Sequence, residues 1–205
     1  MKILEGDGQD YHVITHAIRA IPADKEGMTC EIGLRRGGGT KYIIDALKRY
    51  NFPCKVHVAI DPYGNIEYER REGIIQRADY TNKMRDQSIG SIYSYAMRSG
   101  INFVFINLED TEFFKRYADG VPVYDEYKDI LSEYVFVHFD GPHGFDSLTA
   151  EFKWFNKRMT PGATIVFDDI RSYDHCKLKR DLIFSHGWAS IQTVGRKASY
   201  QKVAG

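Results

Sequence analysis

The sequence is poor in the features that mark secreted, membrane-spanning or nucleic-acid-binding proteins. Its three cysteines, Cys30, Cys54 and Cys176, are odd in number and lack metal-ligand spacing, so we expect reduced thiols and a cytoplasmic protein. Lys plus Arg and Asp plus Glu both number 28, so no basic excess is available for nucleic-acid phosphates. No run approaches the ~20 apolar residues of a membrane span, and the N-terminus lacks a signal peptide's apolar core.

Internal repeats, low-complexity tracts and a linker-like segment are also absent. A chain of 205 residues is long enough to bury a sizeable core and short enough to form one domain. Hydrophobic residues make up 43% and charged residues 27%, the proportions of an ordinary globular protein. We therefore expect a single domain over residues 1–205.

What the sequence does contain is an alternation of strand-like apolar runs with segments of helical period. Such alternation predicts βαβ units, and hence an α/β protein with a Rossmann-like, doubly wound and mostly parallel sheet of seven strands. Two last strands, 190–194 and 199–203, are expected to form an antiparallel C-terminal hairpin through 195–197. The five parallel strands are predicted at 28–32, 55–60, 102–106, 135–139 and 163–167.

The segments between these strands are predicted from their periodicity. A helix at 10–21 belongs to an N-terminal helical extension, residues 1–27, and a last helix covers 174–186. Residues 65–86 are polar without a clean period, so we read them as a long loop, with 64–86 as a lid over the site. Further helices are expected at 42–50, 89–100, 111–117, 124–134 and 145–159.

A glycine-rich turn follows the first predicted strand. Glu31 ends that strand, Gly33, Gly37, Gly38 and Gly39 form the turn, and Thr40 is a plausible N-cap of the next helix. Glycines let the backbone turn sharply and let a ligand approach, and the helix N-terminus offers free N–H groups. The spacing fits neither GxxxxGK[ST] nor GxGxxG, so packing alone is an equal alternative for the turn by itself.

The second predicted strand ends in Asp61, one βαβ unit after Glu31. An acidic side chain at that position accepts hydrogen bonds from the two ribose hydroxyls of a nucleoside. The alternative is that Asp61 caps a turn, because Asp-Pro is a common turn dipeptide. The preceding glycine-rich turn favours the ribose role.

The ordered series of motifs resembles the class I S-adenosylmethionine-dependent methyltransferases. The series runs from Glu31-x-Gly33-x-x-x-Gly37-Gly38-Gly39-Thr40 and Asp61 to Phe139-Asp140-Gly141-Pro142-His143 and Thr160-Pro161-Gly162-Ala163-Thr164-Ile165-Val166-Phe167-Asp168-Asp169. The last two segments are most similar to the small-molecule O-methyltransferase branch. The resemblance covers residues 30–169.

The resemblance implies S-adenosylmethionine as the cofactor, with Glu31 and Gly33 near its methionine end and Asp61 on its ribose. Gly37, Gly39 and Thr40 would shape the turn. Glu109 and Asp110, after the third strand, fall where the family contacts the adenine. Capping of the helix at 111–117 is an equal alternative for these two residues.

Three carboxylates are predicted at neighbouring strand ends: Asp140, Asp168 and Asp169. Converging carboxylates repel one another unless a cation or a proton intervenes, and hard oxygen ligands suit Mg²⁺ or another divalent cation. Some methyltransferases that resemble this chain hold such an ion, which binds the acceptor hydroxyl. The alternative, that these residues cap the next segment or bond backbone amides, weighs more heavily.

His143 is the best candidate for a general base, and Asp140 is the other candidate catalytic residue. The pKa of a free histidine lies near neutrality, and His143 would stand at the mouth of the cleft. A loop histidine without a catalytic role is the more common outcome. Pro142 and His143 also replace the acidic residue that the family's metal sites often carry there.

The leading hypothesis is therefore an enzyme, a cytoplasmic S-adenosylmethionine-dependent methyltransferase acting on a small-molecule acceptor, most plausibly at a hydroxyl and with a divalent ion. Similar enzymes are often homodimers, so a homodimer is an expectation of the resemblance. Two rivals stay open. One is another nucleotide-cofactor enzyme on the same scaffold, and the other is a non-catalytic binding module.

Overall fold

The structure is a computed structural model that describes residues 4, 8–53, 55–71, 73–77 and 80–203. Cys54 and parts of the predicted segments 1–27 and 64–86 therefore lie outside the described residues. Cys30 is a buried free thiol and Cys176 an exposed one. Within the described residues, no helix is both long enough and apolar enough to cross a membrane.

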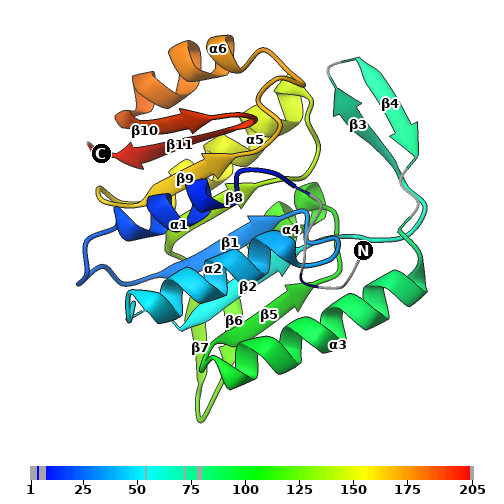
Figure 1. Ribbon diagram of the computed structural model, residues 1–205, viewed down its shortest axis with the longest axis vertical. Helices are drawn as coiled ribbons and strands as arrows, with labels where there is room; N and C mark the ends of the chain where they lie inside the picture. Colours follow the sequence, from blue (N-terminus) through cyan, green and yellow to red (C-terminus); the bar gives the residue numbers. More distant parts are fainter. Residues whose placement is uncertain (1–3, 5–7, 54, 72, 78–79, 204–205) are drawn as a thin grey trace.

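A seven-stranded sheet forms the centre of the molecule, in the order β10-β11-β9-β8-β1-β2-β5 (Figure 1). The five strands from β9 to β5 run parallel, whereas β11 pairs antiparallel with both β9 and β10. The predicted Rossmann-like sheet with its C-terminal antiparallel hairpin is confirmed. The strand bounds are β1 Met28–Ile32, β2 Val56–Ile60, β5 Asn102–Ile106, β8 Tyr134–Phe139, β9 Thr164–Phe167, β10 Trp188–Val194 and β11 Lys197–Lys202.

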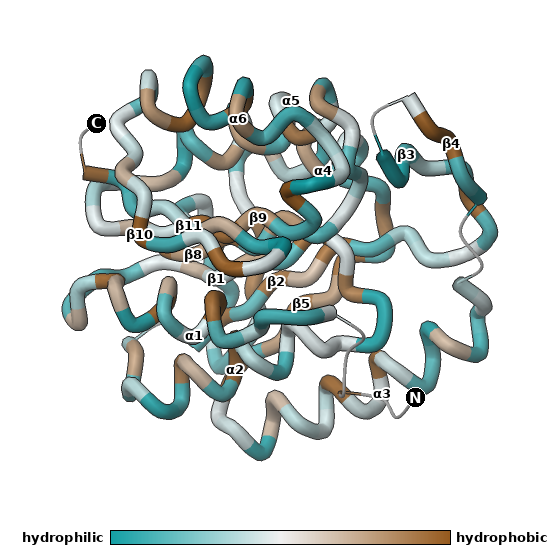
Figure 2. The backbone as a smooth tube through the Cα atoms, turned by 45° about the horizontal axis from the view of Figure 1, so that its top comes forward, coloured by the Kyte–Doolittle hydropathy of each residue, from teal (hydrophilic) through white to brown (hydrophobic). Residues whose placement is uncertain are grey.

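Helices cover both faces of this sheet, which gives three layers (Figure 1). One hydrophobic cluster packs α1, α2 and α3 against one face, and a second packs α4, α5 and α6 against the other. Hydrophobic stretches follow the central strands and hydrophilic ones the outer turns of the helices (Figure 2). The helix bounds are α1 His12–Arg19, α2 Gly38–Arg49, α3 Asn82–Arg98, α4 Asp110–Arg116, α5 Phe145–Asn156 and α6 His175–Leu178.

β1 shows how alternate residues of one strand contribute side chains to the two faces of the sheet. All five of its residues are buried, and successive side chains of a strand point to opposite faces. Met28, Cys30 and Ile32 join the cluster on the α5 side. Thr29 and Glu31 point the other way, toward His57 and α2. A buried polar residue is thereby delivered to the end of the central strand.

The segment predicted as a long loop, 65–86, is instead mostly regular. β3 (Glu67–Arg71) and β4 (Ile74–Arg77) form an antiparallel hairpin, and α3 begins at Asn82 with Thr81 as its N-cap. The hairpin lies apart from the main sheet (Figure 1). β4 is exposed throughout and β3 is at most partly buried, so the sequence carries no fully buried stripe from which the strands are recognised.

The helix predicted at 124–134 is also wrong. That region holds a second antiparallel hairpin, β6 (Val121–Tyr124) with β7 (Lys128–Leu131). The three- and four-residue spacing of tyrosines suggested a helical stripe, yet Tyr124 is 68% and Tyr127 77% exposed. The spacing therefore did not reflect burial. At the C-terminal end, the predicted helix 174–186 is present, although it passes from α6 into a π turn, Lys179–Ile183, and a 3₁₀ turn, Phe184–His186.

Candidate active site

The carboxyl ends of the parallel strands open into a cleft of about 810 Å³. It lies where β1 has β2 on one side and β8 on the other, the point at which open α/β sheets bind ligands. The N-terminal residues Gly8 to Tyr11 and the β3–β4 hairpin form its outer walls. Most of the predicted site residues line this cleft: Gly33, Gly39, Asp61, Glu109, Asp110, Asp140, His143, Asp168 and Asp169. Three others, Glu31, Gly37 and Thr40, lie behind its surface.

Two glycines of the turn occupy positions that admit no side chain. Gly33 has a φ of +89°, and a Cβ there would lie 2.1 Å from the carbonyl oxygen of Asp140. A Cβ on Gly39 would lie 1.9 Å from a carboxylate oxygen of Glu31. The ends of β1 and β8 thus touch through backbone alone, since the Asp140 amide also donates to the Ile32 carbonyl at 3.0 Å. The bare backbone of the turn faces the cleft.

Helix α2 starts within this turn, at Gly38, with Gly37 as its N-cap in a left-handed conformation (φ 77°). Thr40 was predicted as the N-cap, which is wrong, because it sits inside the first turn. Its hydroxyl donates a close hydrogen bond to Glu31 instead. Gly37 replaces a capping side chain because the chain needs a positive φ there, which glycine adopts without a steric penalty.

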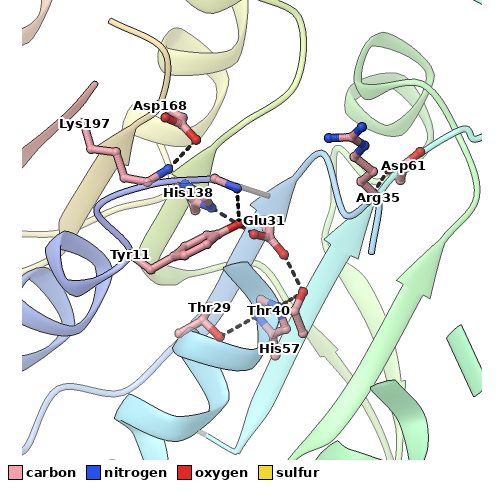
Figure 3. Close-up of polar contacts among 11 residues, drawn as sticks. Tyr11, Thr29, Glu31, Arg35, Thr40, His57, Asp61, His138, Asp168 and Lys197 are labelled. Carbon is pink, nitrogen blue, oxygen red and sulfur yellow. Dashed lines mark hydrogen bonds and ion pairs between the residues drawn. The ribbon is translucent and has the colours of Figure 1, made fainter. Parts of the chain in front are cut away.

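Glu31 is fully buried and holds the turn together from below (Figure 3). Besides Thr40, it pairs with Nδ1 of His138 at 2.9 Å. Glu31, His138 and Asp140 each place an atom that could ligate a metal ion within 4.8 Å of the other two. Burial, reinforced by the Asp168 carboxylate, raises the pKa of Asp140 well above its usual range. Glu31 is thus a scaffold for the turn, and Asp140 is the acid of this group that meets the cleft.

Asp61 holds the other side of the turn. Its carboxylate accepts the amide of Arg35 at 2.8 Å and that of Tyr63 at 2.7 Å, and its side chain is almost fully buried. Burial raises the pKa of Asp61, while these backbone donors oppose the rise. The turn-capping role weighed as the alternative is therefore present in the structure. A carboxylate has about four lone-pair sites, so these bonds leave acceptor capacity toward the cleft.

Glu109 and Asp110 lie at the start of α4, after β5. Glu109 is the N-cap residue, yet its side chain makes no capping hydrogen bond. Both residues line the cleft instead. Behind Asp110 lies Glu151 of α5, which is fully buried, and burial together with Asp110 raises the pKa of Glu151 well above its usual range. The sequence analysis did not single out Glu151. Its position three residues after Leu148, on the apolar stripe of α5, was the available signal that this carboxylate is buried.

His143 follows β8 and is 7% exposed. Its Nε2 lies 3.4 Å from a carboxylate oxygen of Asp169, and its backbone amide donates to the carbonyl of Glu69 in β3 at 2.8 Å. Nδ1 has no hydrogen-bond partner among the described residues. Burial lowers the pKa of His143, although Asp169 and Asp168 oppose this. The neutral imidazole is thus favoured, with a free basic nitrogen.

The carboxylates predicted as a divalent-ion site face protein cations. Lys197, which is fully buried, makes a close ion pair with Asp168, and Arg196 pairs with Asp169 at 2.7 Å. Burial opposes ionisation of Asp168, but Lys197, His138 and the Asp169 amide together outweigh it and lower the pKa of Asp168. Asp140, Asp168 and Asp169 do not form a compact ligand group in the part of the chain that the structure describes. This arrangement does not fit an ion shared by the three.

Sequence reasoning missed Tyr11 as well as these two cations. The Tyr11 ring stacks on Tyr42 with centroids 4.8 Å apart and lies 5.2 Å from the Lys197 ammonium. It covers the Glu31 and His138 pair from the N-terminal side (Figure 3). Arg196 and Lys197 had been read only as a hairpin turn. The sequence carries no local signal for these two cations, because Lys197 and its partner Asp168 are 29 residues apart.

Comparison with known proteins supports a cofactor-binding reading of this cleft. A family model described as "Methyltransferase domain" matches residues 30–170. A search of curated proteins finds no significant match. The shared fold extends to solved structures at low sequence identity, three of which are described next.

The calicheamicin methyltransferase CalS11 has 12% identity and a TM-score of 0.67, covering 94% of this chain and 78% of that one. The O-methyltransferase TomG from Streptomyces achromogenes, in complex with SAM, has 14% identity and a TM-score of 0.56 over 95% and 79%. An O-methyltransferase from Bacillus cereus, in complex with SAH, has 14% identity and a TM-score of 0.57 over 96% and 92%. The chain therefore belongs to the methyltransferase domain family, and its resemblance to the class I S-adenosylmethionine-dependent methyltransferases is confirmed.

Proposed function

We propose that this protein transfers the methyl group of S-adenosylmethionine to a hydroxyl of a small molecule. The observation that carries the proposal is one cleft with two chemically different walls. The side-chain-free backbone of Gly33 and Gly39 forms one wall, and His143, whose buried Nδ1 has no hydrogen-bond partner among the described residues, lines the other. A cofactor fits the first wall and an acceptor the second.

The first wall matches the cofactor's shape and charge. The glycine at position 33 lets the ends of β1 and β8 pack together, and its backbone lines the cleft, where a ligand can lie against it. Asp61 is the proposed ribose acceptor, Asp140 the acid nearest the methionine end, and Glu109 and Asp110 the acids at the adenine. Bound there, S-adenosylmethionine supplies a methyl group on a sulfonium, which is activated for direct displacement.

The proposed role of His143 is to take the acceptor's proton. Asp169 faces Nε2, which favours the tautomer with its proton on that nitrogen and leaves Nδ1 as the base. The acceptor O–H bond breaks and its proton passes to Nδ1. The acceptor oxygen would then be free to take the methyl group that bound S-adenosylmethionine would supply, with S-adenosylhomocysteine as the leaving group. Alignment of oxygen, carbon and sulfur provides most of the rate enhancement of such a step.

The proposal of a small-molecule hydroxyl as the acceptor is supported by the descriptions of proteins with a similar fold. TomG and NovP are described as O-methyltransferases and CalS11 as a TDP-rhamnose 3'-O-methyltransferase. Those descriptions belong to those proteins. In this chain, the cleft wall built by the β3–β4 hairpin supplies Tyr68, Arg70 and Arg77, so polar hydroxylated acceptors suit it better than purely apolar ones.

Calorimetry with S-adenosylhomocysteine tests the cofactor assignment. We expect binding in the micromolar range, as for many enzyme cofactors and substrates, and release of a labelled methyl group to a hydroxylated acceptor in a screen of phenols, catechols and sugars. NAD serves as the comparison ligand. Binding of NAD with no response to S-adenosylhomocysteine would show a different nucleotide enzyme on this scaffold.

His143→Gln is expected to lower kcat by about 100-fold or more, the usual contribution of a positioned base, with the affinity for S-adenosylhomocysteine unchanged. Glutamine keeps the size of the side chain but accepts no proton at neutral pH. His12→Gln, on the exposed start of α1, is the matched control. Equal kcat in the His143 variant and the wild type would remove the base assignment.

A further inference from the structure

We propose that Lys197 and Arg196 occupy the place of the divalent cation, so that this site works without a bound metal ion. The inference rests on the proposed methyl transfer, whose acceptor side it describes. A metal ion in such a site neutralises carboxylates and orients the acceptor oxygen. In this chain two adjacent cations, Arg196 in the β10–β11 turn and Lys197 at the start of β11, are placed to perform the same two tasks.

Lys197 performs the neutralising task. Lysine is almost never fully buried unless it is paired, and Lys197 is 0% exposed. Its ammonium contacts one carboxylate oxygen of Asp168, and the other oxygen accepts the Asp169 amide at 2.6 Å. Both oxygens of Asp168 therefore already face donors. A divalent ion at Asp168 would have to displace a buried cation that has no access to solvent.

Arg196 is placed for the orienting task. Its guanidinium pairs with Asp169 at 2.7 Å and lines the cleft, and its side chain is 45% exposed. A guanidinium presents five N–H donors in a fixed plane, so it can hold Asp169 and an acceptor oxygen together. The other Asp169 oxygen lies 3.4 Å from His143. Asp169 thus links the Arg196 guanidinium to the ring of the proposed base.

The fold fixes both cations in these places. β11 pairs antiparallel with β9, with Ala198 opposite Phe167, which sets Lys197 beside Asp168. The amide of Ile170 donates to the carbonyl of Arg196 at 3.0 Å and ties the turn to the end of β9. Sheet pairing therefore delivers one cation to each of the two neighbouring carboxylates.

One other ligand group needs to be weighed. Glu31, His138 and Asp140 are the only three metal-type ligands that come within 4.8 Å of one another in the ranges the structure describes, and this candidate site is empty. Its Glu31 carboxylate is held by His138 and Thr40. The group also excludes Asp168 and Asp169, so it is not the acceptor-side site that a metal-dependent reaction requires.

The first test uses the wild-type protein and Mn²⁺ as a paramagnetic probe of divalent sites. We expect no Mn²⁺ binding tighter than about 1 mM, with or without S-adenosylhomocysteine. The affinity for S-adenosylhomocysteine and the methyl transfer rate should differ by less than about twofold between a chelator and millimolar Mg²⁺. Tight Mn²⁺ binding, or transfer that stops in the chelator, would overturn the inference.

The second test removes the buried charge. Lys197→Met should lower Tm by roughly 10 °C, because Asp168 loses its buried partner. Millimolar Mg²⁺ should then recover part of that loss by binding the carboxylate that has lost its cation. Lys202→Met is the matched control, since Lys202 is a buried lysine of the same strand whose ammonium donates to the carbonyls of Asn156 and Met159 and pairs with no carboxylate among the described residues. Its loss of Tm should not respond to Mg²⁺.

The response of the two lysine variants to Mg²⁺ decides between the outcomes. Recovery by Mg²⁺ in the Lys197 variant and not in the Lys202 variant supports the inference, and the same response in both overturns it. If Lys197→Met does not fold, Lys197→Arg keeps the charge, and its transfer rate should be insensitive to the chelator. A wild-type protein that binds no S-adenosylhomocysteine refutes the proposed function, whereas the Mn²⁺ titration still decides the metal question.

Discussion

Gly33→Ala is expected to abolish measurable binding of S-adenosylhomocysteine, with a loss of affinity of at least about 100-fold. The new Cβ would lie 2.1 Å from the carbonyl oxygen of Asp140 and 2.6 Å from its carbonyl carbon. Backbone atoms cannot rotate away as a flexible side chain does, so the ends of β1 and β8 must separate. The cleft is built on that contact, and its cofactor wall moves with it. Stability should fall by about 3 kcal/mol or more.

Gly100→Ala is the control for the conformational part of this effect. Gly100 also has a positive φ, +68°, but a Cβ there meets nothing within 4 Å. Only the left-handed backbone penalty applies, about 1–2 kcal/mol, and cofactor affinity should be unchanged. Urea unfolding and calorimetry on both variants separate strain from collision. If Gly33→Ala binds S-adenosylhomocysteine as tightly as Gly100→Ala, the backbone contact does not shape the cofactor wall.

Asp61→Ala is expected to weaken S-adenosylhomocysteine binding by about 10- to 100-fold, because a buried acceptor and its ribose bonds are lost together. The amides of Arg35 and Tyr63 lose their partner, so the free energy of unfolding should also fall by about 1–3 kcal/mol. Asp174→Ala provides the comparison. It removes a carboxylate that accepts the backbone amide of Lys177, at a helix start outside the cleft.

A 2′-deoxyribose analogue of S-adenosylhomocysteine distinguishes ribose binding from turn holding. Wild-type protein should bind the analogue about tenfold more weakly than the parent ligand, and Asp61→Ala should bind both alike, since the partner of the missing hydroxyl is gone. An equal penalty for the analogue in both proteins would assign Asp61 to the turn alone.

The sequence was sufficient for the central strands because their burial leaves a direct trace in composition. β1 and β5 appear at the predicted residues, 28–32 and 102–106. Parallel strands covered on both faces read as largely apolar runs, and β1 keeps this character despite Thr29 and Glu31. The site residues at their ends were also predictable, because strand ends in this topology meet at one edge. Gly33, Asp61, Asp140 and His143 all line the one cleft.

The two small hairpins were not predictable from periodicity, for a physical reason. Ile74 is 54% and Ile75 62% exposed, so the apolar residues of β4 record no buried face. Tyr124 and Tyr127 are exposed in the same way, and their helical spacing is incidental. The spacing of apolar residues predicts secondary structure only where those residues are buried. A hairpin that stands away from the sheet buries few apolar side chains, so their spacing in the sequence is not constrained.

The cations were missed because their meaning depends on partners far away in the chain. Arg196 and Lys197 read locally as the turn of a hairpin, and only the pairing of β11 with β9 sets them against Asp169 and Asp168. Asp168 and Asp169 alone suggested a bare acidic cluster. Charge balance in a buried site is a property of the tertiary structure, so single segments could not show it.

The contact between the β3–β4 hairpin and His143 bears on how the acceptor range of this enzyme can change. The His143 amide is anchored to the carbonyl of Glu69, and the Glu69 side chain fills the space that Gly144 leaves open. The hairpin that lines the proposed acceptor side of the cleft is therefore also the element that holds the proposed base. If the proposed roles hold, a substitution that reshapes this wall also moves His143, so selectivity and turnover are expected to change together.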